Sequence, residues 1–210
     1  MLETLRNVWK VEELRKKLIY TFLMLLLYRL VGMIPVSGIN AEVVAELANT
    51  YDMLGLINMM TGSAFSQMTV MAMGISPYIN ASIIMQLLCV AIPALEELNK
   101  SGDEGRKKIA QITRYATVIL SLLLGVAYYF MVRNNYGAIA SYAKTGFAGV
   151  FAAIVIVLCF TAGSTLVMWL GEQINKNGIG NGISILLFAG ILSSLPTGLI
   201  NLWNIFMQGV

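Results

Sequence analysis

Histidine is missing from this chain of 210 residues, cysteine occurs twice, and only 12% of the residues are charged. Without histidine the chain lacks the commonest general base and metal ligand, and the sequence predicts no metal site. Cys89 and Cys159 lie far apart within apolar runs, which indicates small buried side chains and no disulfide framework. Soluble domains carry about a quarter charged residues. The shortage of charge therefore predicts a membrane protein, and the net charge of +3 does not indicate nucleic-acid binding.

The signatures of common enzymes are also missing. The stretch "NGIGNGIS" at residues 177–184 contains no lysine and follows no predicted strand, so it lacks the context of a phosphate-binding loop. The pattern G-x-S-x-G does not occur, and Cys89 has no histidine that could activate it. The sequence therefore predicts no catalytic residue, no cofactor and no enzyme.

Long apolar runs are what the sequence has in abundance. A helix crosses a membrane with about 20 mainly apolar residues. Five runs reach or approach that length, at residues 18–33, 77–92, 115–132, 147–170 and 183–200. Residues 1–17 are instead charged and amphipathic. We therefore expect an all-α polytopic membrane protein with five transmembrane helices behind a polar N-terminal segment.

The distribution of lysine and arginine predicts the orientation of these spans. Basic residues cluster within residues 1–17 and 94–114, whereas residues 34–73 contain none. Cytoplasmic loops carry the excess of basic residues. The N-terminus and the loops at 94–114 and 171–182 are therefore expected on the cytoplasmic side.

One apolar region is interrupted. "TGSAFSQMTVMAMGIS" mixes small polar groups with methionines, and Gly74 and Pro77 end it. We expect a short half-helix over residues 63–73, followed by a full helix from Pro77. Irregular backbone at membrane depth is tolerated only where protein buries it or where it lines a watery cavity. A movable stopper and a space-filling re-entrant helix both fit this pattern.

Polar residues within the next helix have two interpretations. Asn80, Ser82 and Gln86 lie within two turns, and Ser82 and Gln86 share one face. Such groups line a cavity or form hydrogen bonds between helices. Ile75 and Ile79, four residues apart, fit either an apolar constriction or plain packing.

Three glycines punctuate the segment 171–182. Gly178, Gly180 and Gly182 allow positive φ and close helix approach. We expect a tight joint between two spans there.

Two long stretches resemble the SecY family of protein-conducting channel subunits. They are "MGISPYINASIIMQLL" and "LVMWLGEQINKNGIGNGISILLFAGI". The stretches "RLVGMIPVSGIN" and "SGDEGRKKIAQITRY" fit the same family, and "GEQI" and "GIGNGISI" are similar to its bacterial branch. The family has ten spans in two inverted halves of five. The resemblance therefore implies that residues 18–210 are the N-terminal half of an inverted-repeat channel.

The resemblance also implies roles for individual residues. The pore ring falls on Ile75, Ile79, Ile183 and Leu187, and the lateral gate on Asn80, Gln86 and Thr113. The plug falls on residues 62–72, namely Gly62, Ser63, Ala64, Phe65, Ser66, Gln67, Met68, Thr69, Val70, Met71 and Ala72.

The implied function is passage of unfolded preproteins across the bacterial inner membrane and sideways release of membrane segments into lipid. The implied partners are the SecE and SecG subunits, the SecA motor ATPase, the ribosome, preprotein substrates and phospholipid. No cofactor is implied, nor any nucleic-acid role beyond ribosome docking. The alternatives are a secondary transporter with a broken helix and a structural subunit without a pore. A transporter would place an ionisable group at mid-membrane, and only Arg29 lies within a predicted span.

Overall fold

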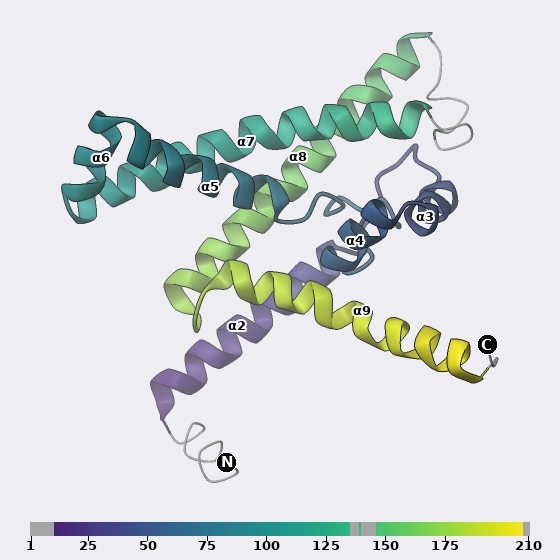
Figure 1. Ribbon diagram of the computed structural model, residues 1–210, viewed down its shortest axis with the longest axis horizontal. Helices are drawn as coiled ribbons and strands as arrows, with labels where there is room; N and C mark the ends of the chain where they lie inside the picture. Colours follow the sequence, from purple (N-terminus) through teal and green to yellow (C-terminus); the bar gives the residue numbers. More distant parts are fainter. Residues whose placement is uncertain (1–10, 135–138, 140–145, 208–210) are drawn as a thin grey trace.

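The computed structural model describes residues 11–134, 139 and 146–207, and helices dominate this part of the chain (Figure 1). The elements are α2 (Glu12–Val31), α3 (Ala41–Thr50), α4 (Asp52–Met60), α5 (Ser76–Ala91), α6 (Pro93–Lys100), α7 (Asp103–Asn134), α8 (Gly146–Asn177) and α9 (Gly182–Met207). Extended pairing in the described part is limited to the isolated bridges Pro35–Thr69 and Ile39–Ile139. The all-α prediction is confirmed.

Three helices are long and apolar enough to cross a membrane, namely Asp103–Asn134, Phe147–Asn177 and the stretch Gly182–Ile200 of α9. The pair formed by α5 and α6 adds a fourth span if it counts as one, although the two axes meet at 102°. Pro93 occupies the first turn of α6, and Ile92 before it is extended, as proline favours. The count of five spans stays a prediction.

Two helices begin earlier than the apolar runs. α2 starts at Glu12, so the predicted polar segment 1–17 ends inside this helix, while residues 1–10 lie outside the described residues. Lys16 Nζ lies 2.9 Å from Glu12 Oε1, an i,i+4 pair that supports the first turns of α2. α7 likewise starts at Asp103 and not near residue 115. Acidic residues in the first turn stabilise both helix starts.

The short helices α3 and α4 were not predicted. Asn40 Oδ1 accepts a hydrogen bond of 3.1 Å from the backbone N–H of Glu42 and caps the start of α3. Val44 and Ala48, one turn apart, form its buried face. The two helices fill the stretch between α2 and the interrupted region that sequence reasoning left without structure.

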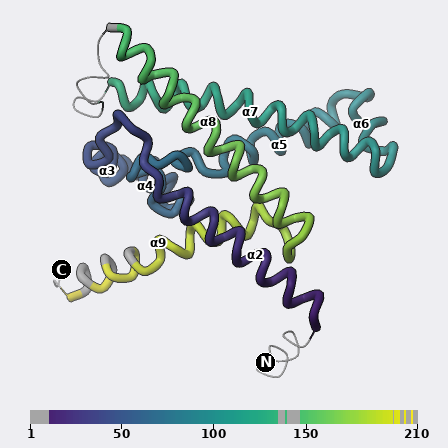
Figure 2. Tube along the Cα trace, turned by 180° about the vertical axis from the view of Figure 1, so that it is seen from behind, coloured from purple at the N-terminus to yellow at the C-terminus, as the bar shows by residue number. Residues whose placement is uncertain are grey.

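The long helices surround the chain between α4 and α5. α7 packs against both α5 and α8, and α8 also contacts α2 and α9. Figure 2 shows α9 diverging from α2 and α8, so that the C-terminal end of α9 stands apart from the other helices. Residues 61–75, here called the central segment, lie where these helices come together (Figure 1).

Candidate functional site

The central segment contains no helix. Hydrogen-bonded turns follow one another from Thr61 to Ile75, so the half-helix predicted over residues 63–73 is wrong. Ser63 and Met68 have backbone φ angles of 70° and 45°. Residues other than glycine rarely adopt such values, and these values interrupt a right-handed helix. Gly62 and Gly74 have positive φ as well, near the two ends of the segment.

The backbone of the central segment is paired with the chain that leaves α2. Val36 donates its N–H to the Met68 carbonyl at 2.9 Å, and Val70 donates to the Ile34 carbonyl at 3.0 Å. These two bonds flank the bridge between Pro35 and Thr69. They satisfy buried polar groups that a regular helix would have satisfied internally.

Side chains satisfy further groups at the start of the segment. The Thr61 hydroxyl accepts from the N–H of Phe65 at 3.2 Å, and Asn58 Oδ1 accepts from the N–H of Ser66 at 2.9 Å. Arg29 Nη1 donates to the Gly62 carbonyl at 3.3 Å. The guanidinium of α2 thus lies at the C-terminal end of α4, where exposed carbonyls favour a cation.

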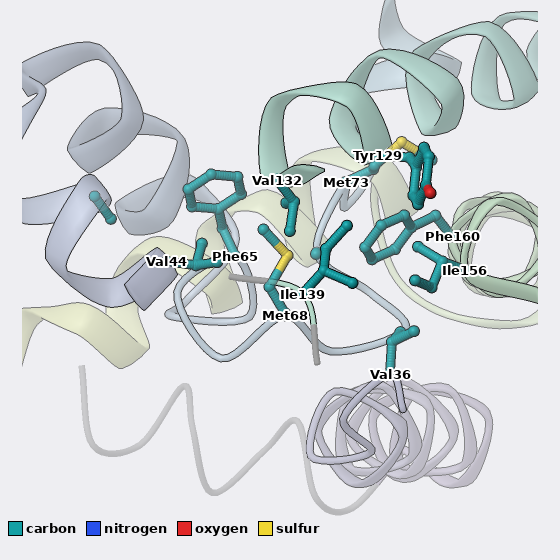
Figure 3. Close-up of a cluster of buried hydrophobic side chains, with 12 residues drawn as sticks. Val36, Val44, Phe65, Met68, Met73, Tyr129, Val132, Ile139, Ile156 and Phe160 are labelled. Carbon is teal, nitrogen blue, oxygen red and sulfur yellow. The ribbon is translucent and has the colours of Figure 1, made fainter. Parts of the chain in front are cut away.

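Two hydrophobic clusters bury the side chains of the central segment. Phe65, Met68 and Met73 belong to a cluster with residues of α3, α7 and α8. Figure 3 shows Phe65 next to Val44, with Met68 close to Ile139. Phe65 also meets Tyr128 edge-on, with ring centroids 5.7 Å apart. The methionines fill irregular space between helices, a use to which their flexible side chains are suited.

Glycines let helices α8 and α9 approach this backbone. A Cβ at Gly163 of α8 would overlap the Val70 carbonyl oxygen. A Cβ at Gly190 of α9 would lie 2.5 Å from the Met60 carbonyl oxygen, and one at Gly62 would lie 2.5 Å from Ser193 Oγ. The central segment is therefore held between two helices at backbone contact.

The four residues expected to form the pore ring belong to one cluster. Ile75 is a buried member, and Ile79, Ile183 and Leu187 pack against it as partly buried side chains. They come from the end of the central segment and the first turns of α5 and α9. Ala64 and Met71, from the expected plug, are buried in the same cluster. The structure thus brings the proposed ring and the proposed plug into contact with one apolar core.

Two of the three expected gate residues share a groove between α5, α6 and α7. Gln86 and Thr113 line this groove of about 410 Å³, and Gln86 Nε2 donates to Ser82 Oγ at 3.4 Å. The shared face of Ser82 and Gln86 is confirmed. The Thr113 hydroxyl donates to the Ile109 carbonyl within α7 at 2.9 Å. Asn80 is exposed and does not line the groove.

A tight joint between two helices is confirmed, but the predicted bounds of 171–182 were too wide: α8 continues through Asn177, and only residues 178–181 separate it from α9. A Cβ at Gly182 would overlap the Gly171 carbonyl oxygen, so α8 and α9 meet there at backbone distance. Asn175 Oδ1 accepts from the Gly182 N–H at 2.7 Å, and Asn181 Oδ1 accepts from the Ile183 N–H at 3.0 Å. The amides of this loop therefore terminate one helix and cap the next.

The joint is also tied to two other helices. The Thr21 hydroxyl of α2 accepts from the Ile179 N–H at 3.1 Å. Arg114 Nε of α7 lies 2.6 Å from Glu172 Oε1 of α8, in a half-buried ion pair.

Sequence reasoning missed Arg29, Thr61, Gly163 and Gly190 as contacts of the central segment. An isolated glycine within a helical pattern lowers helix stability by about 1 kcal/mol relative to alanine, and this cost at Gly163 and Gly190 is the signal that could have indicated close packing there. Nothing in the local sequence of Arg29 or Thr61 indicates its partner, because both contacts depend on how the chain folds back.

Comparisons with known proteins agree with this architecture. The SecY family model matches residues 69–209. Protein translocase subunit SecY of Streptomyces coelicolor is 42% identical over 220 residues, which cover 100% of this chain and 49% of the relative. The subunit of the same name from Bacillus subtilis is 43% identical over 199 residues, covering 93% and 44%. The chain thus spans about half the length of the curated relatives it matches.

Solved channel structures are similar in fold. The structure of Sec61 in the canine ribosome-channel complex from the endoplasmic reticulum aligns with a TM-score of 0.65 at 25% identity, covering 93% of this chain and 42% of the other. A structure concerned with the plug domain of the SecY protein, described as stabilising the closed state of the translocation channel, aligns with a TM-score of 0.62 at 25% identity, covering 93% and 41%.

Proposed function

The chain belongs to the SecY family, and from this premise we propose that it forms the N-terminal half of a protein-conducting channel in the bacterial inner membrane. The complete channel passes unfolded preproteins across the membrane and releases membrane segments sideways into lipid. The part of the relatives that this chain does not cover supplies the opposite wall of the channel. The family assignment replaces the alternative of a secondary transporter.

The observation that best supports the proposal is the cluster that unites Ile75, Ile79, Ile183 and Leu187 with Ala64 and Met71. Branched apolar side chains from three parts of the chain meet in this cluster, together with two further side chains of the central segment. A hydrophobic constriction gates by dewetting, since water does not wet a narrow apolar passage. We assign these four residues to the pore ring and residues 62–72 to the plug.

The form of the central segment suits a movable plug. Many of its backbone hydrogen bonds are made inside the segment, for example from the Met68 N–H to the Phe65 carbonyl at 3.0 Å and from the Ala72 N–H to the Thr69 carbonyl at 2.9 Å. Those bonds are kept if the segment moves as one body. The bonds to Ile34, Val36, Arg29 and Asn58 are among those that movement breaks.

We assign the lateral gate to α5, with Asn80 and Gln86 on it and Thr113 on the adjoining α7. The groove that Gln86 and Thr113 line leaves part of the space between α5, α6 and α7 unfilled. The opposite wall of the gate belongs to the second half.

The partners follow from the same premise. We propose SecE and SecG as companion subunits, and SecA or the ribosome as the driving partner. The Sec61 structure is of a ribosome-channel complex, which supports ribosome docking. The exposed residues Lys100, Arg106, Lys107 and Lys108 and the N-terminus then face the cytoplasm.

The test is the substitution Ile79→Asn in the complete channel. An amide in the constriction favours water where an apolar side chain excluded it. Losing the apolar contacts of one side chain weakens the closed state by about 1 kcal/mol or more, which raises the open population about fivefold to tenfold. The expected result is ion leak through the resting channel in a planar bilayer.

The matched control is Ile83→Asn, one turn further along α5, where the side chain is 50% exposed. It makes the same chemical change outside the cluster, and its resting channel should stay closed. A loss of expression or thermal stability in Ile79→Asn without leak would overturn the ring assignment.

A further inference from the structure

A groove lies between α7 and α8, and none of its lining residues is assigned to the ring, the plug or the gate. Its volume is about 670 Å³, and its lining runs along α7 from Leu122 to Arg133 and along α8 from Gly149 to Leu158. We call it the α7–α8 groove. Arg133 is the single charged residue of this lining; the other residues are apolar apart from the hydroxyl of Tyr129.

Residue size explains why the groove exists. Gly149 and Ala153 are one turn apart on α8 and leave space between the helices, since neither side chain is large enough to fill it. Large apolar side chains stand at its rim. Phe130 is 53% exposed and Val150 is 61% exposed, and among the described residues nothing covers them. In a membrane such a groove is filled by a hydrocarbon chain or by a side of another helix.

The length of the groove matches one acyl chain. At 1.5 Å per residue, the path along α7 from Leu122 to Arg133 is roughly 16 Å. The hydrocarbon core of a bilayer is about 30 Å thick, so one leaflet is about half of that. A helix that crosses α7 and α8 at an angle could contact them over the same depth, so the choice between the two occupants rests on the charge at the end of the groove.

The charge at the end of the groove indicates the kind of lipid. Arg133 lies in the last turn of α7, next to the helix end at Asn134, where the span meets the membrane surface. Its side chain is exposed, and it makes no ion pair or hydrogen bond with the described part of the chain. A guanidinium at the level of the headgroups presents a planar pair of donors that suits a phosphate.

We propose that the α7–α8 groove binds one anionic phospholipid from the leaflet on the side of the loop between these helices. An acyl chain lies along the floor formed by Gly149 and Ala153, and the headgroup phosphate rests on Arg133. The site shares no lining residue with the ring, the plug or the gate groove, although Tyr129 also packs in the cluster that buries Phe65 and Met68. The proposal does not depend on the proposed channel function.

The experiment uses the natural protein that carries this chain, reconstituted in phosphatidylcholine vesicles. The probe is phosphatidylglycerol with a photoreactive group in one acyl chain, added as a trace component, and phosphatidylcholine with the same group serves as the zwitterionic probe. After illumination, mass spectrometry maps the labelled peptides. The anionic probe should label residues 122–133 and 149–158 more strongly than the zwitterionic one.

Two variants and two controls give the test its resolution. Arg133→Gln should lower labelling by the anionic probe about fivefold and leave the zwitterionic probe unchanged, because one basic residue near the surface contributes about that much to binding anionic lipid. Val150→Trp, which fills the groove, should lower labelling by both probes. Arg106→Gln removes a charge at the other end of α7, and Leu123→Trp enlarges a side chain that is 60% exposed outside the groove. Both controls should label as the parent does.

Three results would overturn the proposal. They are equal labelling of the groove by the two probes, anionic labelling that Arg133→Gln leaves unchanged, and crosslinks from the groove to another polypeptide, which would show that a protein helix occupies it.

Discussion

The central segment and α9 are in contact but differ in regularity and burial. The central segment has no regular structure, yet most of its apolar side chains are buried, with Phe65 and Ala72 at 0% exposure. α9 is a regular helix, yet Leu199 and Trp203 each remain 64% exposed. The two meet where Ser194 Oγ of α9 donates to the Met59 carbonyl at 3.2 Å, just before the segment begins.

The difference lies in where backbone hydrogen bonds are made. A helix satisfies its own N–H and C=O groups, so its outer face can be covered by lipid alone. The central segment depends on partners that the rest of the protein must hold in place, including the carbonyl of Ile34 and the side-chain amide of Asn58. Regular structure thus permits exposure in a membrane, and irregular structure requires burial.

The largest expected effect comes from two glycines, one of α8 that packs against the central segment and one of α9. Gly163→Ala places a methyl group against the Val70 carbonyl, and because both groups belong to main chain that is packed in place, we expect a loss of about 3 kcal/mol in the free energy of unfolding. Gly198→Ala in α9 meets no atom within 4 Å and improves helix propensity, so stability should rise by up to about 1 kcal/mol. Unfolding in mixed detergent micelles measures both. Equal effects would show that the segment yields as freely as the exposed helix.

A smaller effect is expected from removing a side-chain acceptor. Thr61→Val keeps the shape of the side chain but leaves the N–H of Phe65 without its partner in a buried site, at a cost of about 2 kcal/mol. The same substitution at Thr50 should cost less than about 0.5 kcal/mol, because the bond from its hydroxyl to the Glu46 carbonyl lies at an exposed position of α3. Both variants can be followed by thermal unfolding. If they melt together, the Thr61 hydroxyl does not hold the segment.

The smallest effect concerns local opening. Arg29→Gln weakens the contact with the Gly62 carbonyl, which is exposed and 3.3 Å long, so we expect a loss of about 1 kcal/mol. Hydrogen exchange of the amides in the central segment should then speed up about fivefold, while exchange in α9 stays unchanged. Arg15→Gln removes a charge from the same helix far from Gly62 and should leave the segment protected. Faster exchange throughout both regions would mean that Arg29 stabilises the whole bundle and not the segment.

The regular helices could be predicted from the sequence. The apolar run at 183–200 predicts α9 in spite of Pro196 inside it, and the run at 147–170 predicts the core of α8, because a helix satisfies its own backbone hydrogen bonds in lipid. The ends were harder to predict. α8 continues to Asn177, since a helix does not stop where the membrane ends.

The central segment could be located from Gly74 and Pro77, but its conformation could not be predicted. Nothing about a methionine favours the left-handed φ of Met68; the bond that its carbonyl accepts from Val36 comes from a distant part of the chain. The ring residues were predicted through family resemblance, because two isoleucines at the spacing of Ile75 and Ile79 are, on their own, far more often ordinary packing. The burial of Ala64 and Met71 in the same cluster required the structure.

The bond between Thr21 and Ile179 has a consequence for the order of events during synthesis. The two residues are 158 positions apart. A ribosome adds about 5 to 20 residues per second, so roughly 8 to 30 s pass between the appearance of the first residue and that of the second. During this interval α2 lacks its contact with the joint between α8 and α9. The Thr21 hydroxyl already donates to the Lys17 carbonyl within the helix at 2.9 Å. Only the acceptor capacity of its oxygen is therefore unused until the N–H of Ile179 has been synthesised and reaches it.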